Sequence, residues 1–176
     1  MTKIINIFGG PGIGKSTVIA GLFHQMKVQH IDVEIANEVA KDYVWEDRTN
    51  VLKEDQLIIF AKQHRRIYRL IGKVDYVIAD CPLLMCIPYI PKNSYKLLEP
   101  LMVEVWNSFD NISFVLNRAD VEYNPSGRYH TEEQSVKKHN EIVDVLNKYQ
   151  VPYTEVDVGP AAPKEIIKLL SVAEMD

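Results

Sequence analysis

The segment Gly9-Gly-Pro-Gly-Ile-Gly-Lys-Ser16 decides the fold. It matches the pattern G-x-x-x-x-G-K-[ST], whose glycines let several backbone N–H groups turn inward toward phosphate oxygens. The pattern is informative between a strand and a helix, and both are predicted here. A short β-branched run precedes it at Lys3–Phe8, and apolar residues at helical spacing follow it over Ser16–Val28. In this context a phosphate-binding loop is favoured over a glycine-rich turn that binds nothing.

Outward from this loop, short apolar runs alternate with helical patterns. Further strands are predicted at residues 31–36, 74–79, 112–116 and 152–158. Further helices are predicted at residues 37–44, 54–71, 94–109, 131–149 and 163–173. Residues 45–50 and 81–93 are expected to be connections, and Pro100 is expected to kink or break its helix. The alternation predicts an α/β fold, a five-stranded parallel sheet with helices on both faces.

Composition excludes several classes of protein. The chain has 176 residues, of which 47% are hydrophobic and 25% charged, as expected for a single globular domain over residues 1–176. The net charge of −4 argues against a basic nucleic-acid coat protein. Cys81 and Cys86 have neither a zinc spacing nor the pattern of a disulfide framework. Without a run of about 20 apolar residues or a signal peptide, the chain is expected to be cytoplasmic, with no membrane partner.

The loop and the ends of the strands supply the candidate nucleotide and metal ligands, because ligands bind beyond the carboxyl ends of parallel strands. Lys15 is expected to contact the β- and γ-phosphates of ATP, Ser16 to ligate Mg²⁺, and Thr17 to contact the α-phosphate. Asp80 follows the strand at 74–79, where a carboxylate can hold Mg²⁺; a turn aspartate is the alternative. The predicted nucleotide-binding residues are Gly9, Gly10, Pro11, Gly12, Ile13, Gly14, Lys15, Ser16, Thr17 and Arg118.

Three polar residues are candidates for contact with a phosphoryl acceptor. Glu38 follows the second predicted strand, where a carboxylate can take a proton from an attacking hydroxyl group. Asp42 lies one helical turn later and is the reserve candidate; an ordinary exposed acid is the alternative for both. Gln63, on the long helix at 54–71, can hydrogen-bond the edge of a pyrimidine base.

Arg118 and Arg128 flank a polar, turn-rich segment that is predicted to be a lid over residues 118–131. An arginine on a closing lid can stabilise the negative charge of phosphoryl transfer, whereas a solvated surface loop is the alternative. The segment Asn117-Arg-Ala-Asp120 imitates the guanine-reading N-K-x-D pattern. Its companion D-x-x-G is missing, since Leu83 stands three residues after Asp80, so a switch GTPase is not favoured.

The long helix also carries a stripe of basic residues without an acid among residues 62–73. The stripe consists of Lys62, Arg65, Arg66, Arg69 and Lys73. A solvated helix face is one interpretation, and contact with a polyanion such as DNA is the other.

Five segments together resemble the small bacteriophage-type P-loop kinases of the NadR-like AAA group. They are residues 5–17, 37–45, 55–63, 74–80 and 123–128. That group is similar to nicotinamide riboside kinases, thymidylate kinases and phage 5-hydroxymethyluridine DNA kinases. The resemblance implies a sheet order of 2-3-1-4-5, ATP with Mg²⁺, and a lid arginine matched here by Arg128. Thymidylate kinases have an arginine where Cys81 follows Asp80, which argues against a nucleoside monophosphate acceptor.

Residues and resemblance together predict an ATP-dependent kinase acting on a hydroxyl group of a nucleoside-like acceptor. Lys15, Glu38, Asp80 and Arg128 are its expected catalytic residues. The favoured acceptor is 5-hydroxymethyluracil in phage DNA, because the resemblance and the basic stripe agree; the protein then works in the host cytoplasm. Nicotinamide riboside or a deoxynucleoside is the alternative acceptor. A P-loop ATPase switch acting through a partner, or a nucleotide-binding module without turnover, are the alternative classes. No pattern indicates an oligomeric state.

Overall fold

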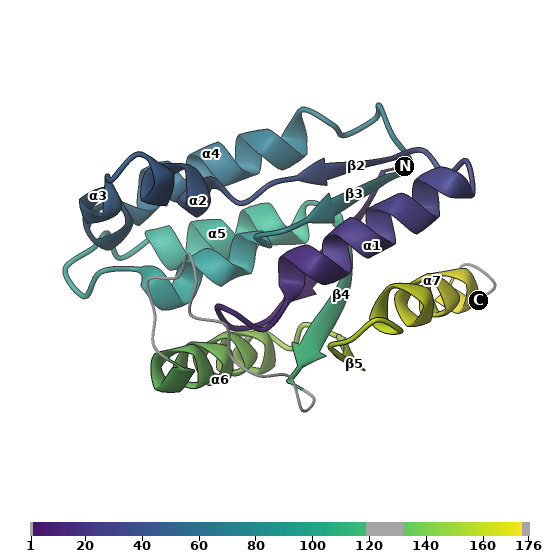
Figure 1. The fold of residues 1–176 in the computed structure, drawn as a ribbon. Helices are drawn as coiled ribbons and strands as arrows, with labels where there is room; N and C mark the ends of the chain where they lie inside the picture. Colours follow the sequence, from purple (N-terminus) through teal and green to yellow (C-terminus); the bar gives the residue numbers. More distant parts are fainter. Residues whose placement is uncertain (1, 119–131, 174–176) are drawn as a thin grey trace.

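A five-stranded parallel sheet forms the centre of the molecule (Figure 1). The computed structural model describes residues 2–118 and 132–173. The strands are β1 (Lys3–Phe8), β2 (Val33–Ala36), β3 (Tyr76–Ala79), β4 (Asp110–Asn117) and β5 (Thr154–Asp157). They lie in the order β2-β3-β1-β4-β5, which confirms the predicted α/β fold and sheet order.

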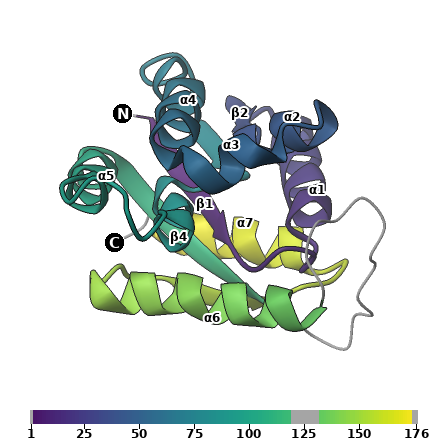
Figure 2. The same ribbon diagram turned by 90° about the vertical axis from the view of Figure 1, so that its left-hand side faces the viewer.

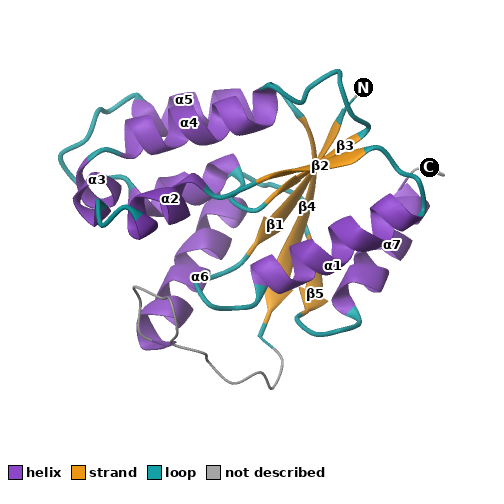
Figure 3. Ribbon diagram, turned by 45° about the horizontal axis from the view of Figure 1, so that its top comes forward, coloured by secondary structure: helices purple, strands orange, loops and turns teal. Residues whose placement is uncertain are grey.

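Helices cover both faces of this sheet. They are α1 (Lys15–Val28), α2 (Val39–Trp45), α3 (Thr49–Glu54), α4 (Gln56–Tyr68), the 3₁₀ helix η1 (Leu83–Tyr89), α5 (Leu98–Asn107), α6 (Glu132–Lys148) and α7 (Ala162–Ala173). Figures 2 and 3 show α1 and α7 on one side of the strands and α4, α5 and α6 on the other. None of the helices in the described ranges is long and apolar enough to cross a lipid bilayer.

The alternation of side chains along β1 explains the two layers, because successive residues of a strand point to opposite faces. Ile5 and Ile7 are buried against the apolar residues of α1 and α7. Ile4 and Phe8 are buried in the other core, with residues of α2, α4, η1, α5 and α6. A strand that is buried on both faces is expected to be largely apolar, as β1 is except for Lys3 and the buried Asn6.

Three local elements differ from the sequence-based expectations. Helix α3 forms within the region around residues 49–54, which the sequence analysis divided between a connection and the start of the long helix. Helix η1 forms inside the predicted loop at 81–93, with five consecutive buried residues from Leu83 to Ile87. Pro100 does not break α5, because the helix begins at Leu98 and its first-turn N–H groups have no intrahelical partner to lose.

The register of the strands brings the candidate site residues to one edge of the sheet. Ala79 pairs with both Ala36 and Asn6, so β2, β3 and β1 reach this edge together. The backbone N–H of Asp80 donates to the carbonyl of Ala36 at 3.1 Å. Asp80, the turn that leads to Glu38, and the loop after β1 therefore lie side by side.

Candidate active site

The loop between β1 and α1 has the backbone geometry of an anion cradle. Gly14, at the N-terminus of α1, adopts a left-handed conformation with a φ of 104°. L-residues with a side chain rarely adopt this conformation, and an added Cβ would also lie 2.8 Å from Val158 Cγ2. No acidic residue stands in the first turn of α1, so its positive end is not neutralised.

Lys15 lies against this loop. Its Nζ donates to the carbonyl oxygens of Gly9 at 3.0 Å and Gly10 at 3.5 Å. These carbonyls hold the ammonium at the edge of the cradle, where it can reach a bound polyphosphate.

Helix α6 packs directly on the phosphate loop. The N–H of Gly10 donates to Nδ1 of His139 at 3.3 Å, and the Ser135 hydroxyl donates to the carbonyl of Pro11. A Cβ at Gly10 would lie 2.6 Å from the carbonyl oxygen of Ser135, so only glycine allows this approach. No sequence pattern singled out Ser135 or His139, although they fasten the loop to the helix that follows the predicted lid.

His139 must be neutral to accept this hydrogen bond at Nδ1. Burial lowers the pKa of His139, and the positive charges of Lys15 and Arg118 lower it further, whereas Glu155 opposes them. The unfolded chain therefore takes up a proton near pH 6.5, while the folded chain does so only at lower pH. His139 thus contributes stability that is present above about pH 6.5 and lost as the pH falls through the folded-state pKa.

We expect a His139→Asn variant to lose less stability than the wild type as the pH falls. The measurement is the urea midpoint of unfolding from about pH 7.5 down to about pH 5. Burial also lowers the pKa of His64, but this residue is present in both proteins, so their difference isolates His139. Equal slopes for the two proteins would show that His139 titrates alike in the folded and unfolded chains.

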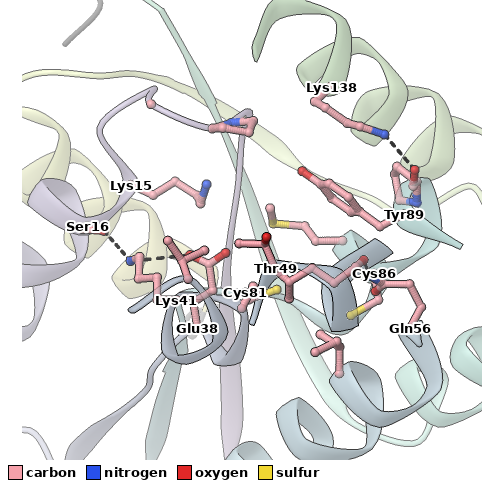
Figure 4. Close-up of a pocket in the computed structure, with 18 of the residues that line it drawn as sticks. Lys15, Ser16, Glu38, Lys41, Thr49, Gln56, Cys81, Cys86, Tyr89 and Lys138 are labelled. Carbon is pink, nitrogen blue, oxygen red and sulfur yellow. Dashed lines mark hydrogen bonds and ion pairs between the residues drawn. The ribbon is translucent and has the colours of Figure 1, made fainter. Parts of the chain in front are cut away.

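Lys41 of α2 joins three of the predicted site residues, and Figure 4 shows it beside two of them, Ser16 and Glu38. Its Nζ lies 2.7 Å from Asp80 Oδ2, 2.9 Å from Ser16 Oγ and 3.5 Å from Glu38 Oε2. Burial alone would lower the pKa of Lys41, but the hydrogen bond to Asp80 and the charges of Asp80 and Glu38 outweigh it, so the pKa is raised. Sequence reasoning missed Lys41; the readable signal was its spacing, three residues after Glu38 on a helix.

Asp80 and Ser16 fit a magnesium site. Asp80 is only 5% exposed, and its Oδ1 is buried without a hydrogen-bond partner among the described residues. A carboxylate and a hydroxyl oxygen are hard ligands that Mg²⁺ accepts, and it takes its remaining ligands from water and substrate phosphates. Within the described part of the chain, no cluster of three or more His, Cys, Asp or Glu side chains could hold a metal. The two residues therefore fit a metal that arrives with a nucleotide.

A cavity of about 560 Å³ adjoins the loop, a size typical of small-molecule sites. Lys15, Ser16, Glu38 and Lys41 line its end at the loop. The rest of the lining includes Val44, Thr49, Leu52, Gln56, Ile59, Met85, Tyr89 and Ile90, together with Lys53, Lys138 and the 79%-exposed Trp45. The cavity thus combines a charged end at the loop with a mostly apolar remainder that also contains two lysines.

Two groups in the cavity wall keep their protons. Burial raises the pKa of Tyr89, so its hydroxyl group can still donate a hydrogen bond. A hydrogen bond with Cys86 and burial raise the pKa of Cys81. Both cysteines are free, buried thiols, and Cys81 is too poorly ionised to act as a nucleophile.

Two predicted acceptor-binding residues do not line this cavity. Gln63 is 0% exposed; its Oε1 accepts from the N–H of Val39 at 3.0 Å and its Nε2 donates to the carbonyl of Asn37 at 3.2 Å. It therefore fastens the turn that carries Glu38. Asp42 is exposed and forms an ion pair with Arg66 of α4.

The predicted lid arginines and the residues of the basic stripe lie in different parts of the chain. Arg118 directly follows β4, and Arg128 lies outside the described residues. In the stripe, Lys62 donates to the Tyr43 hydroxyl at 2.6 Å, and Arg66 donates to the carbonyl of Asn37 as well as to Asp42. These two residues tie α4 to α2, whereas the side chains of Arg65 and Arg69 are exposed.

This geometry defines the chain as a P-loop protein, in which a glycine-rich loop joins the first strand of a parallel sheet to a helix. Residues 4–163 match the family model described as AAA domain, and the chain belongs to this family. The predicted resemblance to the NadR-like AAA group is thereby confirmed at the level of family and fold. No curated protein matches the sequence.

Three solved structures have a similar fold. NadR protein in complex with NR is 20% identical with a TM-score of 0.61, over 90% of this chain and 46% of that one. NadR protein in complex with NAD and AMP-PNP is 18% identical with a TM-score of 0.68, over 95% and 48%. Deoxyadenosine kinase from M. mycoides is 16% identical with a TM-score of 0.54, over 97% and 99%. The chain spans about half the length of the NadR structures.

Proposed function

We propose that this protein is a kinase that transfers the γ-phosphoryl group of ATP to a hydroxyl group of a nucleoside-like acceptor. The main support is that one cavity joins the phosphate loop to the Glu38 carboxylate and to an apolar pocket. A donor, a base and an acceptor can meet in this space. The similar solved structures include a NadR protein with AMP-PNP and a deoxyadenosine kinase, which agrees with this proposal.

In the proposed reaction, the amides of the loop and Lys15 bind the β- and γ-phosphates. Ser16 and Asp80 would hold Mg²⁺, which would neutralise charge on the phosphates. Glu38 takes the proton of the acceptor hydroxyl group while the oxygen of that hydroxyl attacks the γ-phosphorus. The bond from the γ-phosphorus to ADP breaks, and ADP leaves with the bonding electron pair. Arg128, from the proposed lid, and Arg118 are assigned to the γ-phosphate.

The cavity supports an acceptor without a phosphate of its own. No arginine stands among the described residues that line it. Two lysines line the cavity besides Lys15 and Lys41, namely Lys53 and Lys138. Lys138 is engaged, because its Nζ donates to the carbonyl of Pro88 at 2.8 Å and to Glu141 at 2.6 Å, and Lys53 also interacts within the protein. A nucleoside monophosphate requires a dedicated cationic partner, and arginine is the usual one. A nucleoside-like base fits the apolar end, where Tyr89 can hydrogen-bond its edge.

We propose 5-hydroxymethyluracil in phage DNA as the first acceptor to test. The base would have to leave the duplex to enter the cavity, as in other enzymes that modify a base. The exposed Arg65 and Arg69 are available to the DNA backbone. A free nucleoside is the second candidate, and the engagement of Lys62 and Arg66 within the protein favours it.

The test offers labelled ATP and Mg²⁺ with free nucleosides, nucleoside monophosphates, plain DNA and DNA that contains 5-hydroxymethyluracil. Label on a single acceptor class identifies the substrate. An Arg65→Ala, Arg69→Ala double variant should slow transfer to DNA and leave transfer to a free nucleoside unchanged. Phosphate release that no acceptor alters would instead indicate an ATPase switch, and the kinase proposal would be abandoned.

A further inference from the structure

Lys41 places a positive charge where the two proposed magnesium ligands meet. Its Nζ lies 2.7 Å from Asp80 Oδ2 and 2.9 Å from Ser16 Oγ. A magnesium ion sits about 2.0–2.1 Å from its oxygen ligands. An ammonium group and a metal ion on the same oxygens would lie close together, so their like charges repel each other and each weakens the binding of the other.

The surroundings explain why the ammonium is held there. Asp80 is buried, and a buried carboxylate needs an opposite charge or hydrogen-bond donors. Among the described residues, Lys41 donates to Asp80 Oδ2, whereas Asp80 Oδ1 has no hydrogen-bond partner. Glu38, at 3.5 Å, adds a second negative charge on the same helical face. Lys41 is therefore the counter-charge of two carboxylates.

Lys41 is also able to leave. It extends from α2 at the wall of the cavity, and its side chain is 44% exposed, so movement of its four-carbon chain requires no repacking of the core. Its contact with Glu38 does not involve the proposed metal ligands. The cavity beside it is the space that the phosphates would fill.

We propose that Lys41 competes with Mg²⁺ for Asp80 and Ser16 and so makes metal binding depend on the nucleotide. This inference rests on the proposed function, because it uses the proposed metal ligands. Free Mg²⁺ must displace the ammonium without any compensation. A metal–nucleotide complex brings phosphate charges that offset the loss and give the ammonium a new partner. The nucleotide-free protein therefore binds the metal weakly.

The first test measures binding of Mn²⁺, without nucleotide, by electron paramagnetic resonance. A Lys41→Gln variant keeps a hydrogen-bond donor near Asp80 but removes the charge, and we expect it to bind Mn²⁺ about tenfold or more tightly than the wild type. Lys41→Arg keeps the charge and should bind as weakly as the wild type. Lys27→Gln is the matched control, because it removes a lysine that pairs with Glu34 on the surface, and its affinity should not change.

A second test uses only the wild-type protein and so does not depend on a variant that folds. Lysine acylation followed by mass spectrometry should show Lys41 reacting faster at saturating Mn²⁺, with Lys27 unchanged. Unchanged reactivity of Lys41, or equal Mn²⁺ affinity of Lys41→Gln and wild type, would overturn the inference. Neither readout needs turnover: tighter metal binding by Lys41→Gln in a protein that phosphorylates nothing supports the inference and rejects the kinase. If the protein is a working kinase but Lys41→Gln binds Mn²⁺ no more tightly than the wild type, the proposed function is supported and this inference is rejected.

Discussion

Replacement of Glu38 by glutamine is expected to slow phosphoryl transfer by about 10²–10⁴-fold, the usual contribution of a positioned general base. Glu38 lines the same cavity as Lys15 and Ser16, so its carboxylate can reach a hydroxyl group placed there. Glutamine has nearly the same shape and keeps an oxygen for Lys41, but it cannot take a proton. Single-turnover transfer from labelled ATP measures the effect, and equilibrium binding of ATP should stay within about twofold.

Two neighbouring variants, one at the C-terminal end of α2 and one within it, sharpen this result. Glu46→Gln removes an exposed carboxylate that pairs with Arg48, and it should transfer at the wild-type rate. Asp42→Asn tests the reserve candidate, whose ion pair with Arg66 directs it to α4. A fast Glu38→Gln variant together with a slow Asp42→Asn variant would move the base to Asp42.

The fold and the phosphate loop could be predicted because their signals are local. The loop needs glycines, a lysine and a serine within eight consecutive residues, and the strand before it is mostly apolar. Asp80 and Glu38 could be placed at one edge because parallel strands end together, and the pairing of Ala36 with Ala79 shows this arrangement. In each case a pattern within one or two elements contained the information.

The partners of these residues could not be predicted in the same way, since they come from distant parts of the chain. Lys41 meets Asp80 across 39 residues of sequence, and Gly10 meets His139 across 129. In the sequence, Lys41 looks like any lysine on a short amphipathic helix. Only the packing of α2 against the end of β3, and of α6 against the loop, turns these residues toward the site.

Burial explains why the observed position of Gln63 differs from its predicted role in binding the acceptor. A glutamine on a helix is usually exposed, so its amide was available in principle to a base. The structure buries it completely, where its two hydrogen bonds serve the backbone of Asn37 and Val39. A buried amide group has to satisfy its own donors and acceptors, and the backbone at the start of α2 offers matching ones. Its contribution is thus to the position of Glu38.

Replacement of Lys15 by alanine is expected to lower the rate of transfer by about 10²–10³-fold, the typical loss when one electrostatic contact to the transition state is removed. Lys15 brings a positive charge to the cradle, and the described residues of the loop from Gly9 to Ser16 contain no other charged side chain. Negative charge that develops between the β- and γ-phosphates would lose its nearest cation from the loop. The measurement is single-turnover transfer at saturating ATP, with a titration of ATP affinity beside it.

The same variant should keep its fold, which separates a lost function from a lost structure. Among the hydrogen bonds of the described chain, Lys15 Nζ donates only to the carbonyls of Gly9 and Gly10. Both glycines are buried, so the free energy of unfolding should fall by about 0.5–1.5 kcal/mol, the usual net contribution of a hydrogen bond. Lys27→Ala, on the same helix and away from the cradle, is the control with wild-type transfer. Transfer by Lys15→Ala at the wild-type rate would mean that Lys15 does not stabilise the transferred phosphoryl group.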